Sequence, residues 1–167
     1  MDMLFEVAAR WLHFLAALVW VGHNYATAVT RSRYVPLTAA DLSDPDSPRQ
    51  RALMQREHGA FRYASLVVLG SGLAMLSERG WLAEALSLQG SLVPLGVGIW
   101  LALIMVCNLW FVLWPHQKRV LGFVPAPLEE RLRCSRITFL SARVNTMLSI
   151  PVLFFMASGA HGLALYV

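Results

Sequence analysis

Histidine is the residue type in this sequence with the clearest capacity for chemistry. The 167-residue chain contains five histidines, His13, His23, His58, His116 and His161. A neutral imidazole binds transition metals, haem iron among them, and exchanges protons near neutral pH. Two of them, His13 and His23, lie inside long apolar stretches, and His161 directly follows another. These imidazoles are the first candidates for a buried cofactor site, because ionisable groups in such stretches are usually functional.

Motifs for other chemistry are missing from the sequence. It has no Cys-x-x-Cys-His for covalent haem, no phosphate-binding loop, no Gly-x-Ser-x-Gly and no His-Glu-x-x-His. We therefore predict no catalytic residues and no self-contained hydrolase or kinase. The apolar stretches also lack aspartate and glutamate, which argues against a proton-relay transporter. Methionine and histidine side chains can also ligate copper, but the methionines are scattered along the sequence. A copper site is therefore a lesser alternative.

The composition predicts that these residues are positioned by membrane-spanning helices. Hydrophobic residues make up 57% of the chain and charged residues only 14%, whereas soluble domains carry about 25% charge. A bilayer core needs roughly 20 apolar residues per helix. We expect one all-α domain over residues 1–167, a four-helix transmembrane up-down bundle. Its predicted spans are Trp11–Val29, Ala60–Leu76, Leu92–Trp114 and Ile137–Ala160.

The basic residues between the spans predict the orientation of the bundle. The first and third connections, called loop one and loop three below, carry five basic residues each, whereas the N-terminal segment carries only Arg10 and the second connection only Arg79. Basic loops stay in the cytoplasm. Both termini are therefore predicted on the outer, periplasmic side of a bacterial inner membrane. The basic surplus is interpreted as a topology signal and not as a nucleic-acid-binding surface.

Two further predictions concern the ends of the spans. Asp2 and Glu6 occupy the segment where a signal peptide would be basic, so the first span is expected to be retained as a membrane helix. Asp46-Ser47-Pro48 supplies a helix N-cap, which predicts that the second helix starts before the membrane and continues into it.

An outer haem site is predicted from the matched depths of His13 and His161. His13 lies about two residues into the first span from the outer side, and His161 lies at the outer end of the fourth. Neighbouring first and fourth helices would let both imidazoles ligate one haem b iron from opposite sides. Arg10, on the same face as His13, is expected to pair with a propionate. The alternative is that both histidines only hydrogen-bond between helices.

A second, inner set is formed by His23, His58 and Arg62. His23 is ten residues from His13, which is ~15 Å along a helix, so one haem cannot use both. The inner set would therefore need a second haem, with His23 and His58 as its iron ligands. The alternative is that His58 and His116 are ordinary interface histidines. The remaining intramembrane polar groups are assigned to packing: Asn108 and Asn145 are expected to bond across helices, and Arg143 to reach the interface.

Several motifs resemble the membrane domain of the bacterial membrane-bound urate hydroxylases, and they occur in the same order across all four spans. His13 and His161 correspond to family histidines, whereas His23 and His116 do not. The first span also looks like that of membrane protoporphyrinogen oxidases, which bind haem b. The resemblance implies a haem-associated membrane module. Its motifs are Arg10-Trp11-Leu12-His13 with Trp20-Val21-Gly22, Phe61-Arg62-Tyr63 with Gly72, Asn108-Leu109-Trp110 with Trp114 and Gln117-Lys118, and Ser141–Asn145 with Leu148–Met156 and His161.

These observations lead to a ranked expectation of function. The first is a membrane cytochrome b that moves electrons between a periplasmic donor and a quinone or a partner subunit. The second is a cofactor-free structural subunit of a larger respiratory or photosynthetic complex. The third is a urate-hydroxylase-like membrane oxidoreductase. The expected cofactor is one haem b, or two if the inner set also binds.

Overall fold

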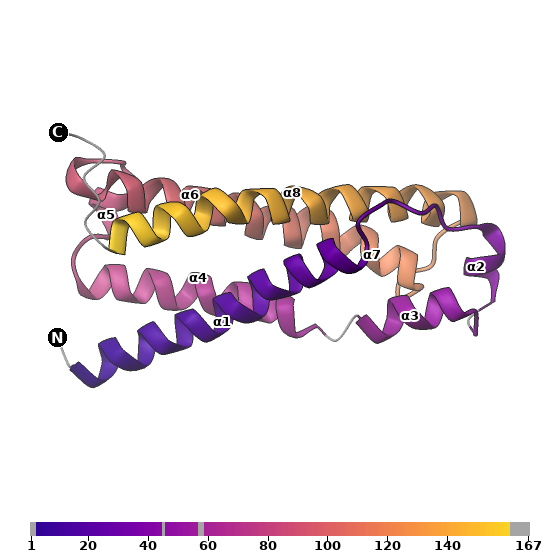
Figure 1. The fold of residues 1–167 in the computed structure, drawn as a ribbon, viewed down its shortest axis with the longest axis horizontal. Coiled ribbons are helices and arrows are strands. Elements are labelled where there is room, and N and C mark those ends of the chain that lie inside the picture. The colour runs from indigo at the N-terminus through magenta and orange to yellow at the C-terminus, as the bar shows by residue number, and fades with distance from the viewer. Residues whose placement is uncertain (1–2, 45, 57–58, 161–167) are drawn as a thin grey trace.

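The computed structural model describes residues 3–44, 46–56 and 59–160, and every regular element within these segments is a helix. Four long helical segments lie side by side and shorter helices connect them (Figure 1). Each long segment is long and apolar enough to cross a membrane. The predicted four-helix, all-α architecture is therefore confirmed. The elements are α1 (Met3–Thr30), α2 (Ala39–Ser43), α3 (Pro48–Arg56), α4 (Ala60–Glu78), α5 (Leu82–Leu86), η1 (Gly90–Leu92), α6 (Val93–Cys107), η2 (Asn108–Leu113), α7 (Trp114–Leu121) and α8 (Leu128–Ala160).

Helices α1 and α4 form one antiparallel pair. His13 of α1 contacts Ser71 of α4, and His23 of α1 stacks on Phe61 of α4. The contacted residue number falls along α4 as the residue number rises along α1, so the two helices run in opposite directions. Trp20, which lies between the two histidines on α1, is buried in the main apolar cluster. The α1–α4 pair therefore positions both of the histidines that were predicted within the first span.

Helices α6 and α8 form the second pair, which is joined by a buried polar network. The Asn108 side-chain amide donates to the carbonyl oxygen of Ser141 at 2.9 Å and to Oδ1 of Asn145 at 2.7 Å. Ser141 Oγ returns a hydrogen bond to Asn108 Oδ1 at 2.8 Å, and Asn145 Nδ2 donates to the Met105 carbonyl at 3.1 Å. The predicted bonding of Asn108 and Asn145 across helices is thus confirmed.

Helices α1 and α8 are adjacent at one end only. Their hydrogen bonds involve α1 residues from Asn24 onward: Thr146 donates to the Asn24 carbonyl at 3.5 Å, and Ser149 donates to the Tyr25 hydroxyl at 3.4 Å. Figure 1 shows the N-terminal half of α1 diverging from α8, with α4 drawn between them in this view. The predicted adjacency of the first and fourth helices is confirmed at the loop-one end alone.

The second predicted helix is divided into α3 and α4. The helix does begin at Pro48. Ser47 Oγ accepts a hydrogen bond from the backbone N–H of Gln50 at 3.1 Å, as an N-cap residue should. Gly59, however, has a φ of +75°, which is a left-handed conformation outside any right-handed helix. The prediction of one helix that runs from the cytoplasm into the membrane is therefore wrong. Sequence periodicity does not reveal such a break, because a glycine inside an apolar pattern is compatible with either outcome.

The third span contains a π-helical segment that its sequence did not predict. The segment η2 follows α6 and precedes Pro115, whose ring nitrogen has no hydrogen to donate to a helix. His116 Nδ1 contacts the Val112 carbonyl at 2.6 Å, inside this segment. Such π-segments change which side chains face a neighbouring helix. Here the segment begins at Asn108, the residue that bonds to α8.

The α6–α8 network makes a testable contribution to stability. Replacing Asn145 with Leu keeps the side-chain volume but leaves the Asn108 amide and the Met105 carbonyl without this partner. We expect Asn145→Leu to lower the free energy of unfolding by about 1–2 kcal/mol, the range for buried hydrogen bonds in membrane helices. Denaturant titration in mixed micelles measures the change. Met147→Leu, at a position 71% exposed on the same helix, is the matched control and should be neutral.

Candidate functional site

His13 is held in a defined orientation by Ser71. The distance from His13 Nδ1 to Ser71 Oγ is 3.0 Å. Ser71 Oγ also lies 2.6 Å from the Val67 carbonyl, to which it donates its one hydrogen. Ser71 Oγ therefore accepts from His13 Nδ1–H. This network assigns the proton to Nδ1 and leaves the lone pair of Nε2 available for a ligand.

Gly72 allows the imidazole of His13 to lie against the backbone of α4. A Cβ at position 72 would lie 3.1 Å from His13 Cε1, tighter than most Cβ contacts, and 3.5 Å from Nδ1, an ordinary contact distance. A larger residue at this position would therefore displace the half-buried ring by a few tenths of an ångström. Together, Ser71 and Gly72 fix both the direction and the depth of His13.

Arg10 lies one turn before His13 and is part of a charged cluster at the N-terminal end of α1. Its guanidinium contacts the carboxylate of Glu6, and the same carboxylate contacts Arg79 at the end of α4. The three residues therefore carry two positive charges and one negative charge. An additional anion near His13 would meet a cluster with one positive charge in excess.

His161 and His58 lie outside the described residues. The proposed pairings of His13 with His161 and of His23 with His58 therefore stay predictions. Helix α8 is described as far as Ala160, the residue that precedes His161 in the chain.

His23 is part of an aromatic contact at the other end of the α1–α4 pair. Its ring lies parallel to that of Phe61, with centroids 3.9 Å apart and planes 2° apart. Thr27 Oγ1 lies 3.5 Å from His23 Nε2, one turn along α1. His23 therefore lies beside the first turn of α4, and its predicted meeting with His58 stays a prediction.

Arg62 lies on an aromatic surface. Its guanidinium carbon is 3.4 Å from the Trp114 ring centroid and 5.7 Å from that of Phe61, and the residue is buried. A guanidinium over an aromatic face is attracted by the ring quadrupole, more strongly where water is excluded. This contact gives Arg62 a structural role in joining α4 to α7. Its predicted role beside a second haem stays untested.

Arg143 caps the C-terminal end of α1. Its Nη2 donates to the carbonyl oxygen of Ala28 at 3.2 Å and also to that of Arg31. The last carbonyls of a helix have no partner within the helix and carry partial negative charge. The sequence predicted only that Arg143 reaches the interface, whereas the structure gives it this defined partner.

A cavity of about 100 Å³ lies beside this end of α1, among α1, α4, η2, α7 and α8. We call it the loop-side cavity. His23, Asn24, Arg31, Gln117 and Arg143 contribute polar groups to its lining, and leucines from η2 contribute apolar ones. Leu37 and Leu53, which precede and follow α2, also line it. The cavity was not predicted, because it is formed by residues from distant parts of the sequence.

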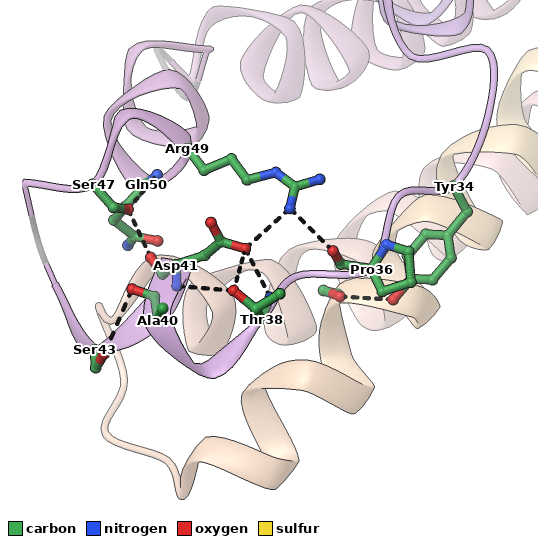
Figure 2. A network of polar contacts seen from close by, with 10 residues as sticks. Tyr34, Pro36, Thr38, Ala40, Asp41, Ser43, Ser47, Arg49 and Gln50 are labelled. Carbon is green, nitrogen blue, oxygen red and sulfur yellow. Dashed lines mark hydrogen bonds and ion pairs between the residues drawn. The ribbon is translucent and has the colours of Figure 1, made fainter.

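Loop one is held in place next to the loop-side cavity by its own polar network (Figure 2). Arg49 donates to Asp41 Oδ2 at 3.0 Å and to the Pro36 carbonyl at 3.1 Å. Hydrogen bonds from the backbone N–H and hydroxyl of Thr38, together with Arg49, lower the pKa of Asp41 below its ordinary value. Tyr34 contacts Ser135 Oγ at 3.1 Å and so attaches loop one to α8.

Within the described residues, no group of three or more His, Cys, Asp or Glu side chains is arranged to hold a metal ion. The copper alternative therefore gains no support from this part of the chain. A haem takes only one or two axial protein ligands, so the absence of a group of three such side chains within the described residues does not bear on the haem prediction.

Comparison with protein-family models, with curated proteins and with solved structures finds no match. The resemblance to the urate hydroxylases stays a prediction from the motifs given above.

The residues that position His13 were the main omission of the sequence-based reasoning. Ser71 was not singled out from the sequence, and Gly72 was named only within a motif of the family resemblance and as a small residue that allows helices to approach. The register of an antiparallel helix pair would have identified Ser71. In such a pair, the start of the first span lies beside the end of the second span. A polar side chain at that level of α4 is the natural partner for His13.

The assigned tautomer of His13 is testable. Replacing Ser71 with Ala removes the acceptor of the Nδ1 proton, so we expect His13 to change from one tautomer to a mixture. Nitrogen NMR of histidine-labelled protein separates the two ring nitrogens. Ser65→Ala is the matched control, since Ser65 is a buried serine of α4 that accepts from Trp110 Nε1. An unchanged His13 spectrum in Ser71→Ala would contradict the assignment.

Proposed function

We propose that this protein is a haem b-binding electron-transfer protein, or a subunit of one, in a membrane. The observation that carries the proposal is the hydrogen bond between His13 Nδ1 and Ser71 Oγ. A metal-binding histidine almost always donates its second ring N–H to a neighbouring acceptor, which fixes the ring and raises the basicity of the ligating nitrogen. His13 has this arrangement on a membrane-spanning helix.

The surroundings of His13 fit the same group. The imidazole is half-buried against Gly72, on a helix whose other faces are apolar. Arg10, one turn away, belongs to a cluster with a positive charge in excess, which suits a propionate. We propose His161 as the second axial ligand, on the basis of its predicted depth and of the family resemblance. Because α1 and α8 diverge at this end of the bundle (Figure 1), the haem would have to lie in the space between them.

A bound haem b would accept and donate single electrons at this site. The protein's contribution is then to hold the ligand and control its environment. Ser71 fixes which nitrogen of His13 points away from α4, and the apolar helices exclude water, which sets the redox potential together with the axial ligands. Arg10 would supply positive charge at the outer edge.

We restrict the proposal to one haem. His23 is stacked on Phe61, and Arg62 lies on Trp114, so these two of the three residues in the inner set have contacts that explain their positions without a cofactor. A second haem held by His23 and His58, with Arg62 beside it, is an outcome that haem counting would reveal.

The charge asymmetry supports a specific membrane placement. We propose a bacterial inner membrane with loops one and three in the cytoplasm and both termini in the periplasm. The apolar residues exposed on α1, among them Trp11, Phe14 and Leu18, are compatible with contact to lipid. A periplasmic donor and a quinone or partner subunit are the proposed redox partners.

The ligand assignment predicts specific losses on mutation. His13→Ala and His161→Ala should each abolish the low-spin bis-histidine signal, because each removes one iron–nitrogen bond. Absorption and paramagnetic resonance spectra report the spin state, and pyridine haemochrome analysis counts haem per chain. His116→Ala is the control and should leave the spectra unchanged, since His116 Nδ1 contacts the Val112 carbonyl in the adjoining η2 segment.

Two outcomes would contradict this assignment. Full low-spin signal in both variants would mean that His13 and His161 are not the ligands, and the inner pair of His23 and His58 would be tested next. Purified protein without haem bands, even after haem reconstitution, would favour a cofactor-free structural subunit.

The orientation is tested separately. Reporter fusions at Asp44, in loop one, should be active in the cytoplasm, and fusions at Gln89, in the second connection, should be active in the periplasm. The reverse pattern would overturn the orientation. The geometry of His13 and Ser71 would be unaffected by that result.

A further inference from the structure

The loop-side cavity has the size of a site for a small molecule. Its volume of about 100 Å³ exceeds the roughly 10–15 Å³ that one water needs and is smaller than the ~300–1,000 Å³ of sites for drug-sized ligands. It lies near the C-terminal end of α1, and Asn24 in its lining is eleven residues from His13. At 1.5 Å per residue this separates the cavity from the proposed haem site by ~16 Å along the helix.

Asn24 is an unusual member of the cavity lining. The residue is only 8% exposed, and its Nδ2 group has no hydrogen-bond partner within residues 3–44, 46–56 and 59–160. A buried donor without a partner costs roughly 1–3 kcal/mol, so few are found in folded proteins. A bound molecule with an acceptor oxygen would remove this cost.

The charge of the lining has one sign. Arg31 and Arg143 both line the cavity, whereas no described lining residue is an aspartate or a glutamate. The carbonyl end of α1 would by itself repel an anion. Arg143 offsets that effect, because it donates to the Ala28 and Arg31 carbonyls. The described lining therefore supplies two guanidinium groups and one amide donor, Asn24 Nδ2, that lacks a partner within the described residues.

We propose that the loop-side cavity binds a small carboxylate anion of a few carbon atoms. Its oxygens would accept from Asn24 Nδ2 and interact with the arginines, since a planar carboxylate matches the geometry of guanidinium donors. Its short carbon chain would contact Leu109 and Leu113 of η2. The loop-one residues Leu37 and Leu53 also line the cavity. This site is separate from the proposed haem site and does not depend on it.

Acetate is the probe that tests the proposal, and acetamide is its uncharged counterpart of nearly the same shape. The full chain in detergent is titrated with each at constant ionic strength, and binding is followed by calorimetry and by the thermal unfolding midpoint. Acetate should bind saturably and raise the midpoint, because a ligand that binds only the folded state stabilises it. Acetamide should have no such effect.

Variants locate the binding. Asn24→Leu removes the buried donor at similar volume, and Arg31→Gln removes one charge, so each should weaken acetate binding at least about tenfold. Arg33→Gln is the matched control, because Arg33 is exposed and does not line the cavity. Circular dichroism verifies folding, and Arg31→Gln alone suffices as a test if Asn24→Leu does not fold.

The results separate this proposal from the haem assignment. Equal stabilisation by acetate and acetamide, or acetate binding that survives both Asn24→Leu and Arg31→Gln, would overturn the carboxylate site. Binding of phosphate in place of acetate would also overturn it. His13→Ala should retain acetate binding, so loss of haem in that variant leaves the carboxylate site standing.

Discussion

The structure depends on one constraint: a polar group on a helix surrounded by hydrocarbon must find its partner on another helix. The network of Asn108, Ser141 and Asn145 satisfies this constraint between the third span (α6 and η2) and α8. Both asparagine side chains donate and accept, and the Ser141 hydroxyl donates. An apolar helix can rotate against another apolar helix at little cost, because lipid solvates every face equally well. Paired amides remove that freedom. The network therefore fixes the rotation and depth of α6 and α8, and the π-helical segment that begins at Asn108 directs its side chain to α8.

The same constraint arranges α1. Its two histidines contact α4, through Ser71 and Phe61, and its last carbonyls accept from Arg143 of α8. The helix is thus held by α4 along its length and by α8 at one end only, which agrees with its divergence in Figure 1. Two donors on α1 are exceptions, since Trp20 Nε1 and Asn24 Nδ2 are buried without a hydrogen-bond partner within the described residues. Of the two residues, Asn24 lines the loop-side cavity, which is why it is informative about a ligand.

The two proposed sites use opposite features of α1. Toward the N-terminal end of α1, Ser71 accepts a hydrogen bond from one imidazole N–H and leaves the lone pair of the other nitrogen available, which suits a metal ion. At the loop-one end, a buried amide donor and two arginines line a cavity, which suits an anion. Both sites lie on the face of α1 that packs into the bundle, so displacement of this helix would alter both. The separate readouts of haem spin state and acetate affinity distinguish such displacement from loss of a single contact.

The sequence by itself determined the four helices and the polar residues within them. Apolar stretches of about 20 residues are sufficient for that, and the cost of burying amides predicted that Asn108 and Asn145 bond across helices. That they bond to each other was shown only by the structure. The break at Gly59, the contact of His13 with Ser71, the position of Arg62 on Trp114 and the loop-side cavity were decided only by the tertiary structure. The physical reason is that helix faces in a membrane protein are almost all apolar. Hydrophobic periodicity, which identifies the buried face of a soluble helix, therefore does not determine which face meets which neighbour.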